Sequence, residues 1–412
     1  MVLVPSTLSP DYWPFSLELL PQPAYMVGGA VRDAILSRKR EYLDLDFVLP
    51  SNAVKTARKI ASHYRAGFVL LDAKRQIARV VFPHATVDFA QQEGDSLTTD
   101  LRRRDFTVNA IAYNPYTQEI IDPLQGYEDL QQGLLRMVSP TNLEDDPLRL
   151  MRAYRQAAQL GFTIESSTQD TIRSLAGCIT QVAAERVRVE LGYMLNSPQG
   201  TPWLIKAWED GLLTPFFNYA TKDSVSLLPE VDKAASQIAE TWHQLGIELS
   251  QYIRDTVKTT RLGIAKLACL VKPEPETAET ELMQLTYSRA EVKAVLTALR
   301  LLPQFQTSQL SLREQYFLFQ EAGLIFPAIV ALAMAYGTPV GETAPSITRY
   351  LNPDDLVAHP TSIVSGNDIM IALKIPASPL VGKLLTEIAL AQIEGKVSTA
   401  AEAIEFAAGL IT

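Results

Sequence analysis

Cysteine and histidine are scarce in this chain of 412 residues, which has two cysteines and four histidines. Cys178 and Cys269 lie far apart and form no CxxC pair, so neither a disulfide framework nor a cysteine-based zinc site is expected. This usage fits a reducing, cytoplasmic location. The histidines are His63, His84, His243 and His359. None is followed by aspartate, so we expect no appended phosphohydrolase domain of the His-Asp type.

Long apolar runs are lacking too. The longest, 324–336, contains Pro327 and is shorter than the roughly 20 residues that a membrane-spanning helix needs. The opening residues MVLVPSTLSPDYWPF have neither a basic segment nor an A-x-A cleavage site, so no signal peptide is expected. We therefore expect no membrane association and interpret the apolar run as a buried helix.

The chain also has no excess of basic residues: its formal net charge is −9. Contact with RNA requires a local basic stripe rather than a basic protein, so the distribution of charge matters more than its sum. Basic residues cluster at 102–104 and again at Arg149, Arg152 and Arg155. By charge alone, each cluster is explained equally well as a solvated surface.

The first 140 residues alternate short β-type runs with helical stretches. We expect strands at 24–27, 43–49, 68–71, 77–82 and 86–90, and helices at 31–38 and 52–63. Two further strands, 110–113 and 119–121, flank a turn-rich Asn-Pro-Tyr-Thr segment and predict a hairpin.

After residue 146, amphipathic helical patterns dominate and strand candidates are few. Ser288 and Glu291 form the capping-box pattern that opens one of these helices. Residues 365–368 and 376–382 are interpreted as a loop that precedes a last pair of helices. The predicted fold class is α+β, with an α/β head at 1–139, a helical neck at 140–200, a helical body at 201–350 and a helical tail at 351–412.

Two glycines and two aspartates form the first candidate site. Gly28 and Gly29 stand between an expected strand and an expected helix, where the backbone can approach a phosphate closely. Asp44 and Asp46 point to the same face of their strand, and such a pair of carboxylates suits a hard cation such as Mg²⁺. Most Gly-Gly pairs are ordinary turns, but the combination within roughly 20 residues is much more specific.

The segment RRDFTVNA at 103–110 is the second candidate site. It combines cations that can bind phosphate with Asp105 and Asn109, which can hydrogen-bond the hydroxyls of a ribose. The alternative is a charged surface cluster that leads into a buried strand, and the pattern alone does not decide between the two.

The segment DDPLRLMRAYR at 145–155 is the third candidate site. On a helix Asp146 and Arg149 are neighbours, and a carboxylate beside a guanidinium can match the Watson–Crick edge of cytosine or adenine. Taken alone, the structural alternative is stronger, because Asp followed by Pro commonly begins a helix with Asp146 as its N-cap. Arg155 lies about 180° around the helix from Asp146, so we expect it to make a different contact.

These segments occur in an order that resembles one known family. GGAVRD, DLDFV, RRDFTVNA, DP..G, DDPLRLMRAYRQAAQLGF and ERVRVEL are similar to the motifs of class II tRNA nucleotidyltransferases and bacterial poly(A) polymerases. That family is a branch of the polymerase-β-like nucleotidyltransferases. SGNDIMIALKIPASPLVGKLL is more weakly similar to the family's C-terminal tails. The resemblance implies a polymerase-β-like head followed by an elongated helical neck, body and tail, with the tail binding tRNA.

The resemblance also implies roles for individual residues. Asp44 and Asp46 would hold the catalytic Mg²⁺ ions, and Asp146 and Arg149 would be the protein template for the incoming base. The further nucleotide-binding residues implied are Gly28, Gly29, Arg32, Arg104, Asp105, Asn109, Arg152 and Arg155. In the implied reaction the 3′ hydroxyl of tRNA attacks the α-phosphate of CTP or ATP, and pyrophosphate leaves.

Two departures from the family pattern bear on the product. The family often has Glu where this chain has Asp145, which leaves the role of that residue open, as it is for Asp88. Complete CCA-adding members usually carry a longer loop before RRD, whereas only residues 90–102 intervene here. The short loop predicts addition of CC alone, with a companion enzyme adding the terminal A. The alternatives are complete CCA addition, A addition or poly(A) synthesis, and, from another class, a non-catalytic RNA-binding protein.

Overall fold

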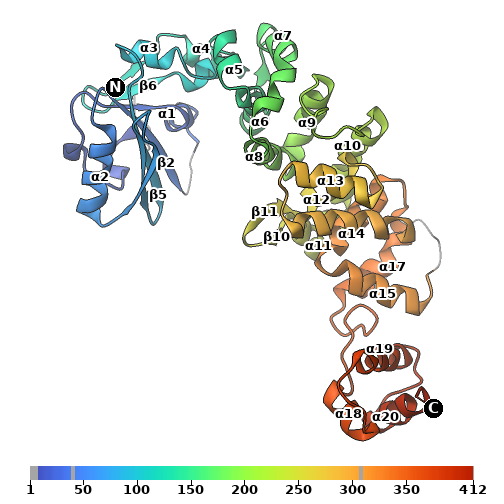
Figure 1. Ribbon diagram of the computed structural model, residues 1–412. Helices are drawn as coiled ribbons and strands as arrows, with labels where there is room; N and C mark the ends of the chain where they lie inside the picture. The colour runs from blue at the N-terminus through green and yellow to red at the C-terminus, as the bar shows by residue number, and fades with distance from the viewer. Residues whose placement is uncertain (1–7, 39–41, 306–309, 412) are drawn as a thin grey trace. The chain divides into compact units, whose positions relative to one another are not determined.

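The computed structural model describes residues 8–38, 42–305 and 310–411. The chain forms two compact units, Met1–Glu190 with Lys206–Leu212, and Leu191–Ile205 with Leu213–Thr412. Within the described residues, the first unit contains a mixed sheet, and the second is helical apart from one small hairpin (Figure 1). The predicted α+β class is confirmed, while the finer division into neck, body and tail stays a prediction.

The elements of the first unit largely follow the expected order. They are β1 (Tyr25–Val27), α1 (Gly29–Ile35), β2 (Leu43–Leu49), α2 (Ala53–Tyr64), β3 (Gly67–Asp72), β4 (Ile77–Phe82), β5 (Ala85–Gln91), α3 (Leu97–Leu101), β6 (Ala112–Asn114), β7 (Glu119–Ile121), α4 (Gly126–Gln132), β8 (Leu134–Leu135), α5 (Pro140–Asp145), α6 (Leu148–Leu160), β9 (Thr163–Ile164), α7 (Ser166–Leu175) and the start of α8 (Ala184–Leu195). The bounds of β2, β4 and β7 are those predicted. By contrast, α1 begins and ends earlier than predicted, and Ser37 after it has a positive φ of 54°.

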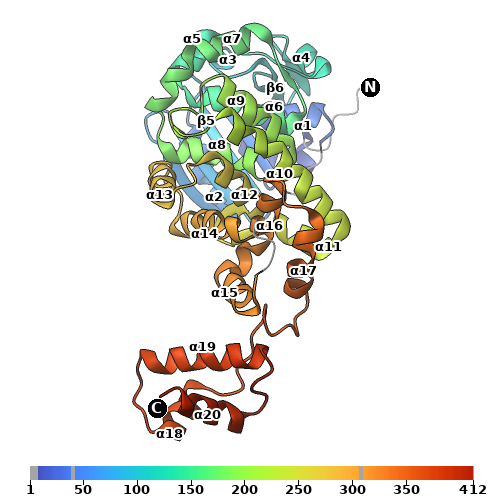
Figure 2. The same cartoon turned by 90° about the vertical axis from the view of Figure 1, so that its right-hand side faces the viewer.

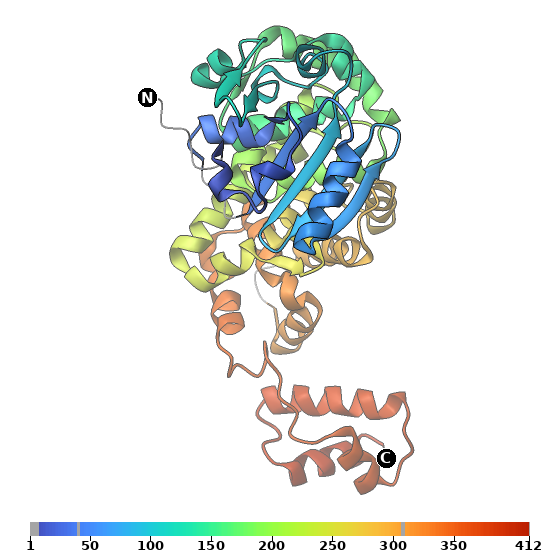
Figure 3. The ribbon, with the colours of Figure 1, turned by 90° about the vertical axis from the view of Figure 1, so that its left-hand side faces the viewer.

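The seven-stranded sheet has the order β3-β4-β5-β2-β1-β6-β7, and only β2 and β5 run parallel among its neighbouring strands. Because side chains alternate along a strand, Leu45, Phe47 and Leu49 share one face of β2. Asp44, Asp46 and Val48 share the other. On the apolar face Phe47 stacks on Phe89 at a centroid distance of 5.6 Å. Helix α2 covers this face (Figure 3), so the opposite face is left to carry the polar residues.

The second unit is built from helices of ordinary length. They are α9 (Thr201–Glu209, shared with the first unit), α10 (Lys222–Thr241), α11 (His243–Ser250), α12 (Arg261–Leu270), α13 (Pro275–Gln284), α14 (Arg289–Phe305), α15 (Leu312–Ala322), α16 (Phe326–Ala335), α17 (Val340–Leu351), α18 (Gly366–Leu373), α19 (Pro379–Ile393) and α20 (Ala400–Gly409). The short strands β10 (Tyr252–Arg254) and β11 (Val257–Thr260) form a hairpin that the sequence did not predict. The capping box predicted at the start of α14 is present, with Ser288 N donating to Glu291 Oε2 at 2.7 Å.

Helix α16 is apolar on all sides and lies in the core against α10, α12 and α14 (Figure 2). The stretch Leu312–Ala335, in which α16 is the last helix, is long and apolar enough by composition to cross a membrane. However, 61% of its most apolar window is buried inside the protein, as in a core helix. The predicted buried helix at 324–336 is therefore confirmed.

Helices α18, α19 and α20 pack together around a small apolar core of their own (Figure 2). Ser365 and Asp368 form a capping box that opens α18, with Ser365 N donating to Asp368 Oδ2 at 2.8 Å. The prediction of a loop at 365–368 is therefore wrong, and the predicted loop at 376–382 ends earlier, where α19 begins at Pro379. The predicted last pair of helices is present as α19 and α20. Serine followed three residues later by an acidic residue is a helix-start pattern, and here it was overlooked.

Candidate active site

One row of polar side chains crosses the exposed face of the sheet. In the register of β2, β5 and β4, Asp46 lies beside Asp88, and Asp88 lies beside Arg79. In the next row Asp44 lies beside Thr86, whose hydroxyl donates to Asp44 Oδ1 at 2.7 Å. The sheet therefore brings Asp44 and Asp46 together on one face, as predicted from their spacing.

The electrostatics of Asp46 favour a bound cation. Burial, followed by the neighbouring charges of Asp44 and Asp88, raises the pKa of Asp46 to about 7. In the described residues no group of three or more His, Cys, Asp or Glu side chains has the geometry of a complete metal site. Mg²⁺ is commonly held by one or two carboxylates together with substrate phosphates. Asp44 and Asp46 fit that pattern, because both are hard oxygen donors that repel each other without a cation.

The turn at Gly28 brings the backbone against these carboxylates. Gly28 has a φ of +73°, which favours glycine, and a Cβ atom there would lie 3.4 Å from Asp46 Oδ2 and 3.3 Å from Arg104 Nη1. The conformation thus favours glycine, and a side chain there would crowd Arg104 and Asp46. The start of α1 at Gly29, the carboxylate of Asp46 and the guanidinium of Arg104 consequently meet at one point, where a triphosphate could be bound.

A hollow of about 450 Å³ adjoins this point, which is a suitable size for a small-molecule ligand. Its floor is the following row of the sheet, Val48, Ala90 and Ile77. Arg104, Asp146 and Arg149 line the same hollow. Residues of the second and third candidate sites therefore line one space, and Arg104 connects it to Gly28 of the first candidate site.

Asp146 does not act as a helix N-cap. It ends α5 in an extended conformation, and Pro147 occupies the N-cap position of α6 without a side-chain contact. The carboxylate of Asp146 instead accepts from Arg186 Nη2 at 3.0 Å. The structural alternative for Asp146 is therefore wrong. Arg149 Nη1 donates to the carbonyl oxygen of Asn142 at 2.9 Å, which holds the guanidinium at the wall of the hollow.

Asp105 and Asn109 belong to a buried network beneath this site. The side chain of Asn109 accepts from Arg32 Nη1 at 2.6 Å and donates to Asp105 Oδ1 at 2.9 Å and to Gln156 Oε1 at 2.8 Å. Arg152 pairs with Asp105 at 3.0 Å. Burial would raise the pKa of Asp105, but Arg152 and Asn109 hold it below its usual value. These residues fix one another, and their direct contact with a nucleotide stays a prediction.

Arg155 lies outside this network, as its position on the helix predicted. Its guanidinium donates to Glu190 and, at 2.6 Å, to Gln159 Oε1. It does not line the hollow of about 450 Å³. A role of Arg155 in nucleotide binding is untested by these contacts and stays a prediction.

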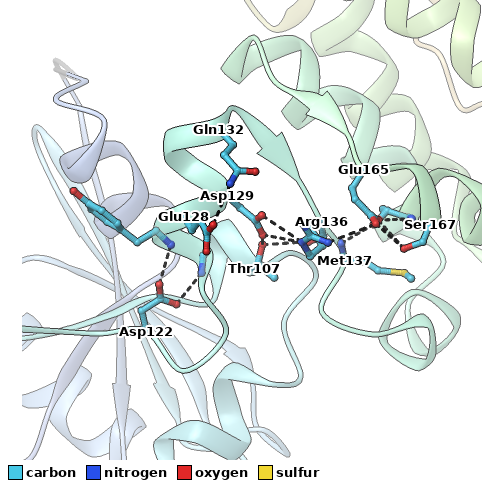
Figure 4. Close-up of polar contacts among 12 residues, drawn as sticks. Thr107, Asp122, Glu128, Asp129, Gln132, Arg136, Met137, Glu165 and Ser167 are labelled. Atoms are coloured by element: carbon cyan, nitrogen blue, oxygen red, sulfur yellow. Dashed lines mark hydrogen bonds and ion pairs between the residues drawn. The ribbon is translucent and has the colours of Figure 1, made fainter.

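A second polar network anchors the RRDFTVNA segment from its other side (Figure 4). Thr107 Oγ1 donates to Asp129 Oδ2 at 2.6 Å, and Arg136 Nε donates to the same oxygen at 3.2 Å. Arg136 also lies 3.5 Å from Glu165, whose carboxylate accepts from Thr168 N at 2.8 Å and caps α7. Sequence reasoning missed Asp129, Arg136 and Glu165, because no local pattern joins residues this far apart.

The DP..G motif explains how α4 reaches this network. Asp122 accepts from the backbone N–H groups of Gly126 and Tyr127 at 2.9 and 2.8 Å, which orients the start of α4 (Figure 4). A Cβ atom on Gly126 would lie 2.2 Å from the carbonyl oxygen of Thr107, so no larger residue fits. The motif therefore holds α4 directly against the RRDFTVNA segment.

The short loop before RRD is fixed by several contacts at the hollow. Glu93 pairs with Arg103 at 2.9 Å and with Arg75 at 3.6 Å, and its N–H donates to Asp100 Oδ1 at 2.9 Å. Asp100 also pairs with Arg104 at 3.3 Å. Glu93 and Asp100 were not predicted as site residues, although the i,i+4 spacing of Asp100 and Arg104 was a readable signal.

The fold and this site define the chain as a nucleotidyltransferase. Family models match three parts of it: the "Poly A polymerase head domain" at 24–136, the "Probable RNA and SrmB- binding site of polymerase A" at 161–223, and the "tRNA nucleotidyltransferase domain 2 putative" at 255–408. A CC-adding tRNA nucleotidyltransferase of Synechocystis sp. is 50% identical over 96% of this chain and 95% of the relative. The chain belongs to the tRNA nucleotidyltransferase family and is an enzyme.

Two further comparisons agree with this membership. A CC-adding tRNA nucleotidyltransferase of Geobacter sulfurreducens is 30% identical over 93% of this chain and 91% of the relative. The solved structure of a CCA-adding enzyme with CTP has a TM-score of 0.73 at 22% identity, and the match covers 94% of this chain and 91% of that one. At this identity the structural likeness supports the fold alone.

Proposed function

We propose that this enzyme adds two cytidine nucleotides from CTP to the 3′ end of tRNA and releases pyrophosphate. The observation that carries the CC-only part of the proposal is the short loop of residues 91–96, which is held in place beside the base-binding hollow. The names of the Synechocystis and Geobacter relatives point to the same product. We further propose that the enzyme acts in the cytoplasm and does not bind a membrane.

The carboxylates of Asp44 and Asp46 would hold divalent cations, which we propose are Mg²⁺. When bound, such cations activate the attacking 3′ hydroxyl and neutralise the charge that develops on the phosphates. The turn at Gly28 and Gly29 brings the backbone close to the triphosphate, and Arg104 supplies a positive charge from the opposite side. The remaining contribution of the chain is to align the 3′ hydroxyl, the α-phosphate and the leaving pyrophosphate.

Base choice would reside in Asp146 and Arg149. The carboxylate of Asp146 has one oxygen on Arg186, which leaves its other oxygen for the amino group of cytosine. The guanidinium of Arg149 is held by Asn142 and can donate to the ring nitrogen and carbonyl oxygen of the same base. Cytosine presents an amino donor next to two acceptors on its Watson–Crick edge, so the pair matches it.

A change from C to A addition would require this pair to be re-aimed at a larger base with a different order of donors and acceptors. Such a movement needs a mobile segment with different contacts in the two states. The loop beside the pair is too short and too well anchored for that role: Gln92 N donates to the Leu49 carbonyl, and Glu93 bridges Arg75 and Arg103. A companion enzyme would then add the terminal A.

The test uses tRNA that ends at the discriminator base, with CTP and ATP present together, and sequencing of the product ends. We expect products that are two nucleotides longer and end in CC. Asp44→Asn, as a matched control, should give no extension. Untemplated extension by many A residues would support the poly(A) alternative. The non-catalytic RNA-binding alternative predicts no extension by either protein.

A further inference from the structure

A third carboxylate lies beside the two aspartates of the metal site. Asp88 is the direct neighbour of Asp46 in the parallel pairing of β2 and β5, and both side chains are on the same face of the sheet. Neighbouring strands are about 4.8 Å apart, so one cation could reach both carboxylates. By position alone, Asp88 is as well placed to bind a metal as Asp44.

Arg79 occupies both oxygens of this third carboxylate. Its Nε donates to Asp88 Oδ1 at 2.7 Å and its Nη2 donates to Oδ2 at 2.8 Å, which is the two-bond geometry of a strong guanidinium–carboxylate pair. The pair is supported by the register of β4 and β5, which places Arg79 directly beside Asp88. The side chain of Asp88 is only 18% exposed. Its lone pairs are therefore largely committed to Arg79.

The other two carboxylates are less committed. Asp44 accepts one hydrogen bond, from Thr86 at 2.7 Å, which leaves its second oxygen open. Among the described residues, the carboxylate of Asp46 has no hydrogen-bond donor. The three aspartates thus share one face but differ in how many of their oxygens are occupied.

We propose that Arg79 is a positioning residue of the metal site, which withholds Asp88 so that only Asp44 and Asp46 bind the divalent cation. This inference rests on the proposed function in taking these two aspartates as metal ligands. Two carboxylates leave several coordination positions of Mg²⁺ for phosphate oxygens and water. Three carboxylates would hold a cation tightly without any nucleotide. Arg79 therefore makes strong metal binding depend on the triphosphate.

The test measures Mn²⁺ binding by electron paramagnetic resonance at pH 8, on the full chain without nucleotide. We expect Arg79→Met, which keeps the length of the side chain, to bind Mn²⁺ about tenfold more tightly than wild type, because it releases a charge next to the cation. The double variant Arg79→Met/Asp88→Asn removes both members of the pair. It should return to within about threefold of wild-type affinity, because the net charge is restored.

Two results would overturn the role of Arg79. Loss of about tenfold or more of Mn²⁺ affinity in the double variant would mean that Asp88 is itself a ligand. An unchanged affinity in a folded Arg79→Met protein would mean that the pair is only structural. The double variant decides the question if Arg79→Met alone does not fold. Asp46→Asn is the control for the metal site: wild-type affinity there would contradict the proposed function rather than the role of Arg79.

Discussion

Buried polar side chains are arranged differently in the two units. In the first unit, Asp105, Asn109 and Arg32 belong to one connected network, and Thr107 and Asp129 belong to another. In the second unit the buried polar side chains are mostly threonines, and charged groups pair with them singly, as Lys266 does with Thr201 and Glu291 with Thr259. A polar group removed from water must find partners in either case.

This difference in connectivity distinguishes the functional region from the rest of the protein. A buried polar pair in the second unit joins two elements, as when Thr259 donates to Glu291, which also caps α14. In the first unit each network connects several side chains, and both include residues of the RRDFTVNA segment. Polar burial marks the functional region only where it forms such connected sets.

Loss of either metal-binding aspartate should have the largest effect. We expect Asp46→Asn and Asp44→Asn each to reduce incorporation about 10³-fold or more, since a cation that neutralises the transition state loses a ligand. The measurement is single-turnover incorporation from CTP with excess Mg²⁺. Circular dichroism serves as the control for folding. Near-normal rates in both variants would mean that Asp44 and Asp46 are not needed for catalysis.

Substitutions of Asp146 or Arg149, which would recognise the incoming base, should alter nucleotide selectivity more than the rate of incorporation. We expect Arg149→Ala to lower the preference for CTP over ATP and UTP by about 10- to 100-fold, because a good bidentate contact contributes about 1–3 kcal/mol of discrimination. Competition assays with mixed nucleotides measure this ratio. Asp146→Asn should also lose selectivity, since Asp146 is not an N-cap. An Asp146→Asn enzyme with full selectivity would disprove its role as a template.

The raised pKa of Asp46 predicts that metal binding depends on pH. This effect is smaller than that of the substitutions above. A proton competes with the cation below about pH 7, so Mn²⁺ affinity without nucleotide should fall by up to about tenfold per pH unit there. The Asp46 carboxyl binds its proton more tightly in the folded than in the unfolded protein. Its contribution to the free energy of unfolding is therefore greatest below the unfolded pKa and is lost as the pH rises through about 7.

Stability measurements check the same shift. Without metal, Asp46→Asn should be more stable than wild type at pH 8 by about 1–3 kcal/mol, and this advantage should shrink toward pH 4. Urea unfolding of both proteins at the two pH values gives the comparison. An advantage that is independent of pH would contradict the raised pKa of Asp46.

The second unit should give the smallest effect on incorporation. Lys266 is fully buried and bonds Asp232 and Thr201, both at 2.7 Å. Lys266→Met should reduce the free energy of unfolding by about 3 kcal/mol, because it leaves Asp232 with an uncompensated charge, while the rate per folded molecule stays unchanged. The control is Lys233→Met, whose exposed pair with Glu230 should matter by less than about 1 kcal/mol. A Lys266→Met enzyme that folds well but lacks activity would break the contrast.

The sequence predicted those parts of the site that depend on local geometry. Asp44 and Asp46 were placed on one face because a strand alternates strictly, and the strand itself was marked by its apolar residues. The N-cap interpretation of Asp146 failed because α6 begins one residue later than predicted, with Pro147 as its N-cap, and the side chain of Asp146 turns to Arg186.

Other parts could not be predicted, because they depend on how distant segments pair. Arg79 meets Asp88 only through the register of two antiparallel strands, which no local pattern specifies. Arg136 joins Asp129 to Glu165 only once the pairing of β8 with β9 has brought Glu165 beside it. The hairpin of β10 and β11 was missed because strands of three and four residues leave little periodicity to detect.

The central claim is that this enzyme stops after CC, because the loop beside Asp146 and Arg149 cannot re-aim them at adenine. The most direct measurement offers tRNA that already ends in CC, with saturating ATP and Mg²⁺, and follows extension by one nucleotide under single-turnover conditions. We expect no addition of A, although the same preparation should extend tRNA lacking CC when CTP is supplied. Efficient addition of a single A to tRNA ending in CC would contradict this claim.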